Sequence, residues 1–372
     1  MKKISDVIQI IIFTVITFGF MIAIFVVPDK DFSRQENRTL AQAPKFSTEA
    51  LKSGELMKEI ELYLTDQFPL RDTWISMKSY TEKLSGKTEN NNVYLGKENV
   101  LIKKFVYPKE NMVEKNTDAV NHLIANTDIP VYFSLIPGAV SIWEDKLPAN
   151  APTYPQKEII DRVYAKVNCT TIDNYSVLKE HGEEYIYYKT DHHWTTLGAY
   201  YGYTALAKGL EIEPKGREEY NVETVSDEFY GTIYSSSGVR WVEPDVIWKY
   251  VSEEGKTVQK IAGKETIPGS FYDYEKLEIK DKYTFFFGGN TALLKITSDC
   301  HNGKKLLVIR DSYSDSEIPF LTDHFSEIYM MDLRYYKFGV SNFLKENKVD
   351  AVLINYSVDN FCEDVNVVMI AG

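Results

Sequence analysis

Two short segments of the chain carry residue types that could act together in nucleophilic catalysis. The first holds Asp191, His192 and His193, and the second places Ser312 three positions after the end of the apolar run 306–309. In an extended segment side chains alternate between faces, so Asp191 and His193 would point the same way and His192 the opposite way. A carboxylate beside an imidazole holds the ring tautomer and stabilises the imidazolium that forms when the ring accepts a proton. A serine next to that imidazole would be the nucleophile.

Each segment also has a purely structural interpretation. The Asp-x-His pattern is a weak signal alone, and it equally suits a hydrogen-bonded strand end beside a packed Trp194. Asp311, Ser312 and Ser314 could serve only as helix caps, because Asp and Ser side chains accept hydrogen bonds from the free N–H groups at a helix start. The joint occurrence of a serine, a histidine and an aspartate favours the catalytic interpretation.

The surrounding elements indicate an α/β fold. Residues 129–137, 304–309, 326–333 and 350–355 are short apolar runs of the kind that is buried on both faces of a parallel sheet. Helix-compatible stretches separate them, which predicts a sheet with helices on its faces. Ser312 would then stand at the carboxyl edge of the sheet, where open α/β folds place their sites, and at a helix start whose free N–H groups can stabilise an oxyanion.

A different pattern occupies the region from about residue 209 to residue 300. Strand-like segments joined by Gly and Ser turns dominate there, and helical periodicity is hard to find. This pattern predicts a β-rich insertion in the α/β domain.

The N-terminus predicts a membrane anchor. Residues 7–27 form an uncharged run of 21 residues, which is long enough to span a bilayer as a helix. Lys2 and Lys3 precede the run, so the positive-inside rule places residues 1–6 in the cytoplasm and the rest of the chain outside. A cleaved signal peptide is the alternative, but it would need a shorter apolar region and a small-x-small exit, whereas bulky residues precede Pro28 here.

These patterns predict a single-pass protein of the cell membrane. Its expected parts are a cytoplasmic N-terminus at 1–6, a transmembrane anchor at 7–27, a polar linker at 28–46 and an extracytoplasmic catalytic domain at 47–372. The catalytic domain would contain the β-rich insertion.

Composition excludes several classes of function. The 372 residues include 54 Asp and Glu against 42 Lys and Arg, which gives a net charge of −12. An acidic chain lacks the basic surface that nucleic-acid binding needs, so we expect no nucleic-acid partner. Three scattered cysteines form neither a disulfide framework nor a CxxC zinc site, and adjacent histidines such as His192 and His193 rarely bind one ion together. We therefore expect no metal and no other cofactor.

Four motifs, taken in order, resemble those of the DHHW family. They are ENR at 36–38, DQFPLR at 66–71, TDHHWT at 190–195 and VIRDSYS at 308–314. The DHHW family is itself similar to the alginate O-acetyltransferase-like branch of SGNH hydrolases, in which the Asp-x-His pair precedes the serine. This chain has that order.

The resemblance implies a fold and a set of catalytic roles. The fold would be an SGNH-hydrolase-like three-layer sandwich with a parallel sheet. Ser312 would be the nucleophile, His193 the base and Asp191 the acid that orients the base.

The resemblance is less specific about the groups that would stabilise an oxyanion or bind substrate. In the wider superfamily the oxyanion donors are the nucleophile's own N–H, a Gly after the second strand and an Asn after the third. By strand order Asn355 matches the Asn, whereas Arg334 stands where the Gly is expected. Arg310 replaces the Gly of the usual Gly-Asp-Ser and could supply a cation beside the site. His192 is a candidate second base, and the turn at 288–290 is a rival source of donors.

The expected function is the transfer of an O-acyl group, foremost acetyl, to hydroxyls of an exopolysaccharide or cell-wall glycan through an acyl-serine. Two alternatives remain open, namely an acetyl esterase on the same glycans and a catalytically silent glycan-binding or envelope-assembly protein. Cytoplasmic acyl-CoA cannot reach an outside domain, so a transferase would need a partner that exports the donor. The resemblance suggests a membrane-bound O-acyltransferase as that partner.

Overall fold

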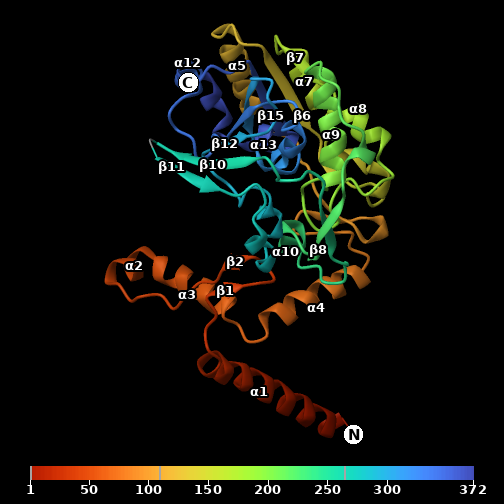
Figure 1. Cartoon of the computed structure of the whole chain (residues 1–372). Coiled ribbons are helices and arrows are strands. Elements are labelled where there is room, and N and C mark those ends of the chain that lie inside the picture. Colours follow the sequence, from red (N-terminus) through yellow and green to blue (C-terminus); the bar gives the residue numbers. More distant parts are fainter. Residues whose placement is uncertain (1, 109, 264) are drawn as a thin grey trace. The chain divides into compact units, whose positions relative to one another are not determined.

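The structure is a computed structural model that describes residues 2–108, 110–263 and 265–372 (Figure 1). Internal contacts divide the chain into two units. The anchor unit comprises the described residues up to Asn90 together with Ser235–Arg240, and the sheet unit comprises Asn91–Tyr234 and Trp241–Gly372. The border at residue 47 that we expected between linker and catalytic domain therefore falls inside the anchor unit.

The sheet unit is built on an eight-stranded sheet with the strand order β11-β10-β12-β14-β13-β15-β6-β7. The strands are β6 Val131–Ile136, β7 Thr170–Ile172, β10 Thr257–Ala262, β11 Glu265–Gly269, β12 Leu293–Thr297, β13 Lys305–Arg310, β14 Glu327–Met331 and β15 Ala351–Ser357. Neighbouring strands from β14 to β7 pair in parallel, whereas β12, β10 and β11 pair antiparallel. The predicted α/β class with a parallel sheet is confirmed.

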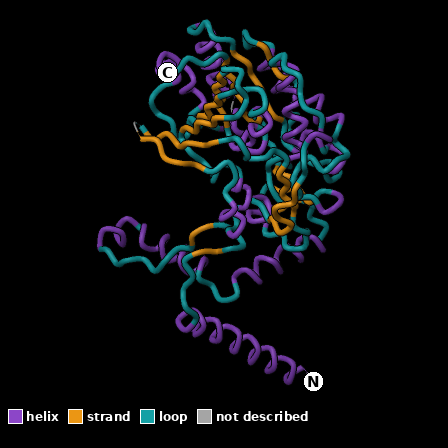
Figure 2. Tube along the Cα trace, viewed as in Figure 1, coloured by secondary structure: helices purple, strands orange, loops and turns teal. Residues whose placement is uncertain are grey.

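Helices cover both faces of the central strands. Every residue of β15 is buried, as are the last five of β13, so neither face of these strands meets water. One group of mutually packed helices contains α5 Glu110–Ala125, α7 Gln156–Tyr164, α12 Val340–Glu346, α13 Val358–Glu363 and η7 Val367–Ala371. A second contains α6 Ala139–Ile142, α8 Asn174–Glu180, α9 Thr196–Gly209 and α11 Ile318–Leu321. Figure 2 shows helices flanking the strands of this sheet.

The region from 209 to 300 is rich in strands but is not one separate body. Its strands β8 Glu223–Phe229 and β9 Asp245–Lys249 form their own antiparallel pair, which is followed in the chain by the three strands that extend the main sheet. The short helix α10 Thr232–Ser237 lies between β8 and β9. The sequence predicted the β-rich character of this region but not that part of it would lengthen the central sheet.

The anchor unit contains α1 Lys2–Val26, β1 Phe32–Ser33, β2 Arg38–Thr39, α2 Thr48–Ser53, α3 Glu55–Asp66 and α4 Arg71–Leu84. Within α1, Ile4–Val26 is long and apolar enough to cross a membrane, and none of its most apolar window is buried. Residues 28–46, which we expected to be a linker, fold back as the antiparallel β1–β2 pair and hydrogen-bond to the end of α3.

Candidate active site

Residues 187–195 form a tight loop that presents Asp191 and His193 together. An antiparallel bridge between Tyr187 and Trp194 closes the loop. The hydroxyl of Thr195 then accepts a hydrogen bond from the Gly198 N–H and caps the start of α9, which fixes where the loop ends. The loop is not an extended strand, so the expected alternation of faces is wrong for His192.

A hydrogen-bonded chain joins the three predicted catalytic side chains. His193 Nε2 lies 2.8 Å from Ser312 Oγ, across 119 positions of sequence. On the other side of the ring, Nδ1 lies 2.6 Å from Asp191 Oδ1. Asp191 and His193 are buried, while Ser312 is partly exposed. This arrangement leaves the Ser312 hydroxyl reachable from solvent and shields Asp191 and His193 from it.

The insertion supplies support for Asp191 that the sequence did not reveal. Thr232 donates to Asp191 Oδ2 from its backbone N–H at 2.7 Å and from its hydroxyl at 2.9 Å. A Cβ on Gly231 would lie 2.2 Å from the Cβ of Asp191, so only glycine allows this approach. Burial raises the pKa of Asp191, but the opposing effects of His192, His193 and Thr232 outweigh it and hold that pKa well below its ordinary value. The carboxylate therefore stays ionised at neutral pH.

Asp245, the first residue of β9, holds the loop from its other side. Its carboxylate accepts hydrogen bonds from the Lys189 N–H at 2.8 Å, the Thr190 N–H at 2.8 Å and the Thr190 hydroxyl at 2.5 Å. The Tyr185 hydroxyl donates to it as well. Burial raises the pKa of Asp245 to about 6 despite these donors. Nothing in the local sequence around Asp245 indicated this contact, because β9 and the loop are more than fifty residues apart.

A ring stacks on the candidate base. The rings of Tyr283 and His193 are parallel within 8°, with centroids 3.8 Å apart. The Tyr283 hydroxyl also donates to the backbone carbonyl of Ser312 at 3.0 Å, so one side chain contacts both His193 and the backbone of Ser312. We expect it to limit rotation of the imidazole.

Asp311 caps the 3₁₀ helix η6 Ser312–Ser316, as the structural interpretation of this segment suggested. Its Oδ1 accepts from the Tyr313 N–H at 3.0 Å. Its Oδ2 accepts from the N–H and the hydroxyl of Ser357 at 2.8 and 2.7 Å and from the Asn360 amide at 2.8 Å. The capping role thus belongs to Asp311, and it ties the loop that carries Ser312 to the end of β15.

Arg310, the last residue of β13, and Asn355, its register partner in β15, lie in the interior of the sheet unit. Both are 0% exposed. The Asn355 amide donates to Ser314 Oγ at 2.9 Å and to Glu317 Oε2 at 2.6 Å, which uses both of its N–H groups. Arg310 Nη1 lies 3.1 Å from Asp315 Oδ1. The expectation that these two residues touch substrate or an oxyanion is therefore not supported by their positions.

Arg334 and the 288–290 turn, which the sequence offered as rival donors, contact each other. Arg334 donates to Asp332 at 3.0 and 2.6 Å and to Asn290 Oδ1 at 3.2 Å, and its side chain is 31% exposed. The hydrogen bonds to Asp332 outweigh burial and raise the pKa of the Arg334 guanidinium. Arg334 thus places a partly exposed cation, held by Asp332, in the loop that follows β14.

His192 lies beside His193 and not on an opposite face. The two ring centroids are 3.9 Å apart, and His192 Nδ1 is 2.7 Å from the Thr232 hydroxyl. Burial, together with the charge of His193, lowers the pKa of His192 well below its ordinary value, so this ring is neutral at pH 7. Ligand atoms of Asp191, His192 and His193 lie within 4.8 Å of one another. A metal ion there would have to break the hydrogen bonds of the Ser–His–Asp chain.

Comparison with known proteins gives a family and a fold. Residues 120–331 match the family described as DHHW protein. A DHHW family protein from Eubacterium siraeum is 24% identical, with a TM-score of 0.65 over 76% of this chain and 95% of that one. Bacillus cereus PatB1 is 20% identical, with a TM-score of 0.62 over 73% of this chain and 97% of that one. Its form with a sulfonyl adduct is 22% identical, with a TM-score of 0.60 over 73% and 94%. The comparison with curated proteins found no match.

Proposed function

The chain belongs to the DHHW family, and we propose that it transfers an acyl group, foremost acetyl, to hydroxyls of an extracytoplasmic glycan through an acyl-serine. One observation carries the proposal, namely the Ser312 Oγ to His193 Nε2 distance of 2.8 Å in a chain that continues to an ionised Asp191. Hydrogen-bond reach between a serine and a base that a third group orients is the geometry that nucleophilic catalysis requires.

The mechanism follows from these contacts. Ser312 Oγ attacks the acyl carbonyl of the donor while His193 Nε2 takes its proton, and Asp191 stabilises the imidazolium. The tetrahedral intermediate collapses, the donor alcohol leaves with the proton from His193, and the acyl group stays on Ser312. An acceptor hydroxyl then attacks the acyl-serine with His193 again as base, and the proton returns to Ser312 as the new ester leaves.

The oxyanion would be stabilised first by the Ser312 N–H. Ser312 is the first residue of η6, and the N–H groups of a first helical turn have no acceptor within the helix. Arg334 is the second candidate, because it follows β14, the parallel neighbour of the strand β13 that precedes Ser312, and its side chain is partly exposed. Asn355 is not part of this proposal, since both its amide hydrogens are already donated.

The proposed location of the protein rests on α1. We infer that Ile4–Val26 spans the membrane and holds the sheet unit outside the cytoplasm, where glycans of the cell envelope are reached. Because acyl-CoA is cytoplasmic, the donor would come through a membrane partner of the membrane-bound O-acyltransferase type. Transfer and hydrolysis share the acyl-serine and differ only in whether a sugar or water resolves it.

A sulfonyl fluoride probe and an aryl acetate together test the proposal. The probe should label Ser312 in the wild-type chain and in Ser341→Ala, a distant serine control, but not in Ser312→Ala or His193→Ala. Hydrolysis of the aryl acetate should fall on the order of a thousandfold or more in both catalytic variants. Equal hydrolysis by wild type and Ser312→Ala would remove the enzyme hypothesis. Adding glycan oligosaccharides as acceptors then separates a transferase, which yields acylated sugar, from an esterase.

A further inference from the structure

The anchor unit exposes an apolar turn immediately before α4. Leu70 is 68% exposed, Trp74 41% and Phe68 37%. Leu70 also adopts the left-handed backbone conformation, with a φ of 60° that is unfavourable for a leucine. Exposed apolar surface is disfavoured in water, and a strained backbone persists only where the surrounding structure holds it, so their coincidence at one residue points to a functional role.

The turn packs against the apolar helix α1. The ring of Phe20 in α1 stacks on Phe68 with centroids 5.2 Å apart and meets Trp74 edge-on at 5.7 Å. A groove of about 450 Å³ runs between Pro69–Leu70 and the face of α1 from Val15 to Val27. Among the described residues that line this groove, Lys30 alone carries a charge.

The position of Phe20 along α1 sets the depth of the turn. Ile4–Val26 has 23 residues and is ~35 Å long at 1.5 Å per residue, slightly more than a hydrocarbon core of about 30 Å. Phe20 stands six residues before Val26, or ~9 Å along the helix. With the N-terminus in the cytoplasm, side chains that touch Phe20 lie in the outer leaflet. Apolar faces of interfacial proteins enter a bilayer to about 5–10 Å, which agrees with this depth.

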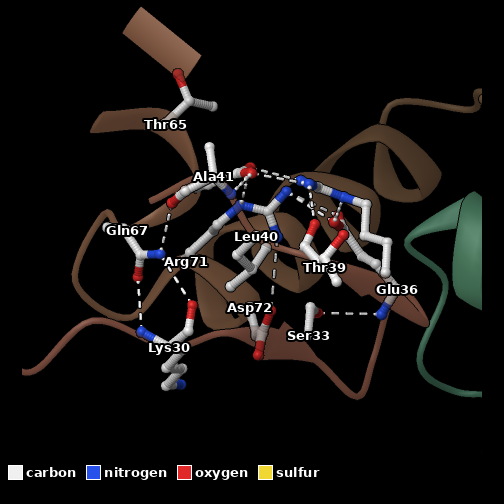
Figure 3. Close-up of polar contacts among 12 residues, drawn as sticks. Lys30, Ser33, Glu36, Thr39, Leu40, Ala41, Thr65, Gln67, Arg71 and Asp72 are labelled. Atoms are coloured by element: carbon white, nitrogen blue, oxygen red, sulfur yellow. Dashed lines mark hydrogen bonds and ion pairs between the residues drawn. The ribbon is translucent and has the colours of Figure 1, made fainter. Parts of the chain in front are cut away.

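A network of ion pairs joins residues on both sides of the turn in the chain (Figure 3). Arg38 binds both oxygens of Asp66 at 2.8 and 2.5 Å and Glu36 at 2.7 Å, and Arg71 binds Glu36 at 2.9 Å. Hydrogen bonding to Arg38 holds the pKa of the Asp66 carboxyl below its ordinary value, so the network is charged at neutral pH. These residues belong to two of the motifs, ENR and DQFPLR, that the catalytic mechanism does not use.

The same network ties the turn to the chain segment that leaves α1. Gln67 accepts a hydrogen bond from the Lys30 N–H at 2.9 Å and donates to the Lys30 carbonyl at 2.9 Å and to the Ala41 carbonyl at 2.8 Å (Figure 3). The Ala41 N–H donates to Asp66 at 2.9 Å. The charged groups are thus paired with one another, and the side chains that project from the turn are apolar.

We propose that Phe68, Leu70 and Trp74 form a wedge that inserts into the outer leaflet of the lipid bilayer beside α1. Acyl chains of the lipids fill the groove between α1 and the turn, and the Lys30 ammonium lies at the level of the lipid phosphates, as lysines beside a span do. The wedge fixes the orientation of the anchor unit at the membrane surface. It rests on the proposed anchoring by α1 and is independent of the acyl-transfer chemistry.

Tryptophan fluorescence in proteoliposomes tests the wedge. The full chain, with α1 verified by intact mass, is reconstituted in phosphatidylcholine vesicles with or without bromine on the acyl chains, since bromine quenches only tryptophans that it contacts in the bilayer. Wild type should lose fluorescence in the brominated vesicles, and Trp74→Phe should lose none. In the Trp74→Phe background, Leu70→Trp should restore the quenching, whereas Lys52→Trp, at an exposed position of α2, should not.

A second variant checks the insertion without removing the reporter. Leu70→Asp should leave the unfolding temperature unchanged, because position 70 is exposed in the protein itself, yet it should reduce quenching of Trp74. Equal quenching of wild type and Trp74→Phe would overturn the proposal, and that is also the outcome if a protein partner covers this surface instead of lipid. Aryl acetate hydrolysis by all these variants should match wild type, which keeps this test separate from that of the catalytic site.

Discussion

Replacing Asp245 with Asn should lower the activity of the protein much more than it changes the stability of the sheet unit. Asp245 accepts hydrogen bonds from Tyr185, from Lys189 and twice from Thr190, and it touches none of the reacting groups. An Asn has the same shape but only one acceptor oxygen, so the donors that face its NH₂ group lose their partner. The segment that leads into the catalytic loop would then shift.

Two opposing effects set the change in stability. Unpaired buried donors cost about 1–3 kcal/mol each, or roughly 2–6 kcal/mol for two of them. Against this, burial raises the pKa of Asp245 from 3.8 to about 6, so keeping it ionised at neutral pH costs on the order of 3 kcal/mol, which Asn does not incur. The net change in unfolding free energy should therefore be at most about 3 kcal/mol at pH 7. Activity should fall more steeply, about a hundredfold, because a small displacement of a catalytic group is enough for such a loss.

The contribution of Asp245 to the unfolding free energy should depend on pH, and the direction follows from its raised pKa. The folded protein holds a proton on Asp245 up to about pH 6, whereas the unfolded chain releases it near pH 3.8. Between these values the folded state binds more protons, so the contribution of Asp245 to stability falls as pH rises through this window and is constant above it. Urea unfolding of wild type and Asp245→Asn from pH 4 to pH 7 measures the difference. A difference that does not change with pH, or a variant with full aryl acetate activity, would refute the reasoning.

Three further substitutions probe the same site. Asp191→Asn should lower kcat for aryl acetate on the order of ten-thousandfold, because the ring loses the carboxylate that fixes its tautomer, and steady-state kinetics will reveal a weaker effect if Asp191 does not orient His193. Gly231→Ala should destabilise the fold by about 1–3 kcal/mol and abolish most activity, since the new methyl would overlap Asp191; a normal melting temperature with normal kcat would contradict the structure. Arg310→Met should destabilise the fold by about 1–3 kcal/mol, because the buried Asp315, whose pKa is already raised to about 7, loses its cation and becomes an unpaired neutral carboxyl, and adding Asp315→Leu should restore most of the loss in denaturant unfolding.

Features that depend on neighbouring residues could be predicted from the sequence. An uninterrupted apolar run predicts a helix such as α1 wherever it lies in the fold, and apolar runs flanked by turns predict buried strands such as β13 and β15. Asp191 and His193 are two residues apart, so a short segment suffices to bring them together. The motifs also indicated the family, and the family match bears this out.

Features that depend on burial and strand order needed the tertiary structure. Strand order suggested Asn355 as an oxyanion donor and the motif suggested Arg310 as a cation beside the site, but both are fully buried, with the Asn355 amide donated to Ser314 and Glu317 and Arg310 paired with Asp315. Thr232 and Asp245 hold the loop of residues 187–195 from a region that its pattern described only as β-rich. The local pattern carries no information on such contacts.

The sequence alone determined how each short segment would fold and which segments carried candidate catalytic residues, because backbone preference and apolar periodicity act over a few residues. Only the three-dimensional structure decided that Ser312 lies within hydrogen-bond reach of His193 and that residues 28–46 pack against α3. Both outcomes depend on which strands and loops become neighbours. That choice is made by the burial of the whole core, to which segments far apart in sequence contribute together.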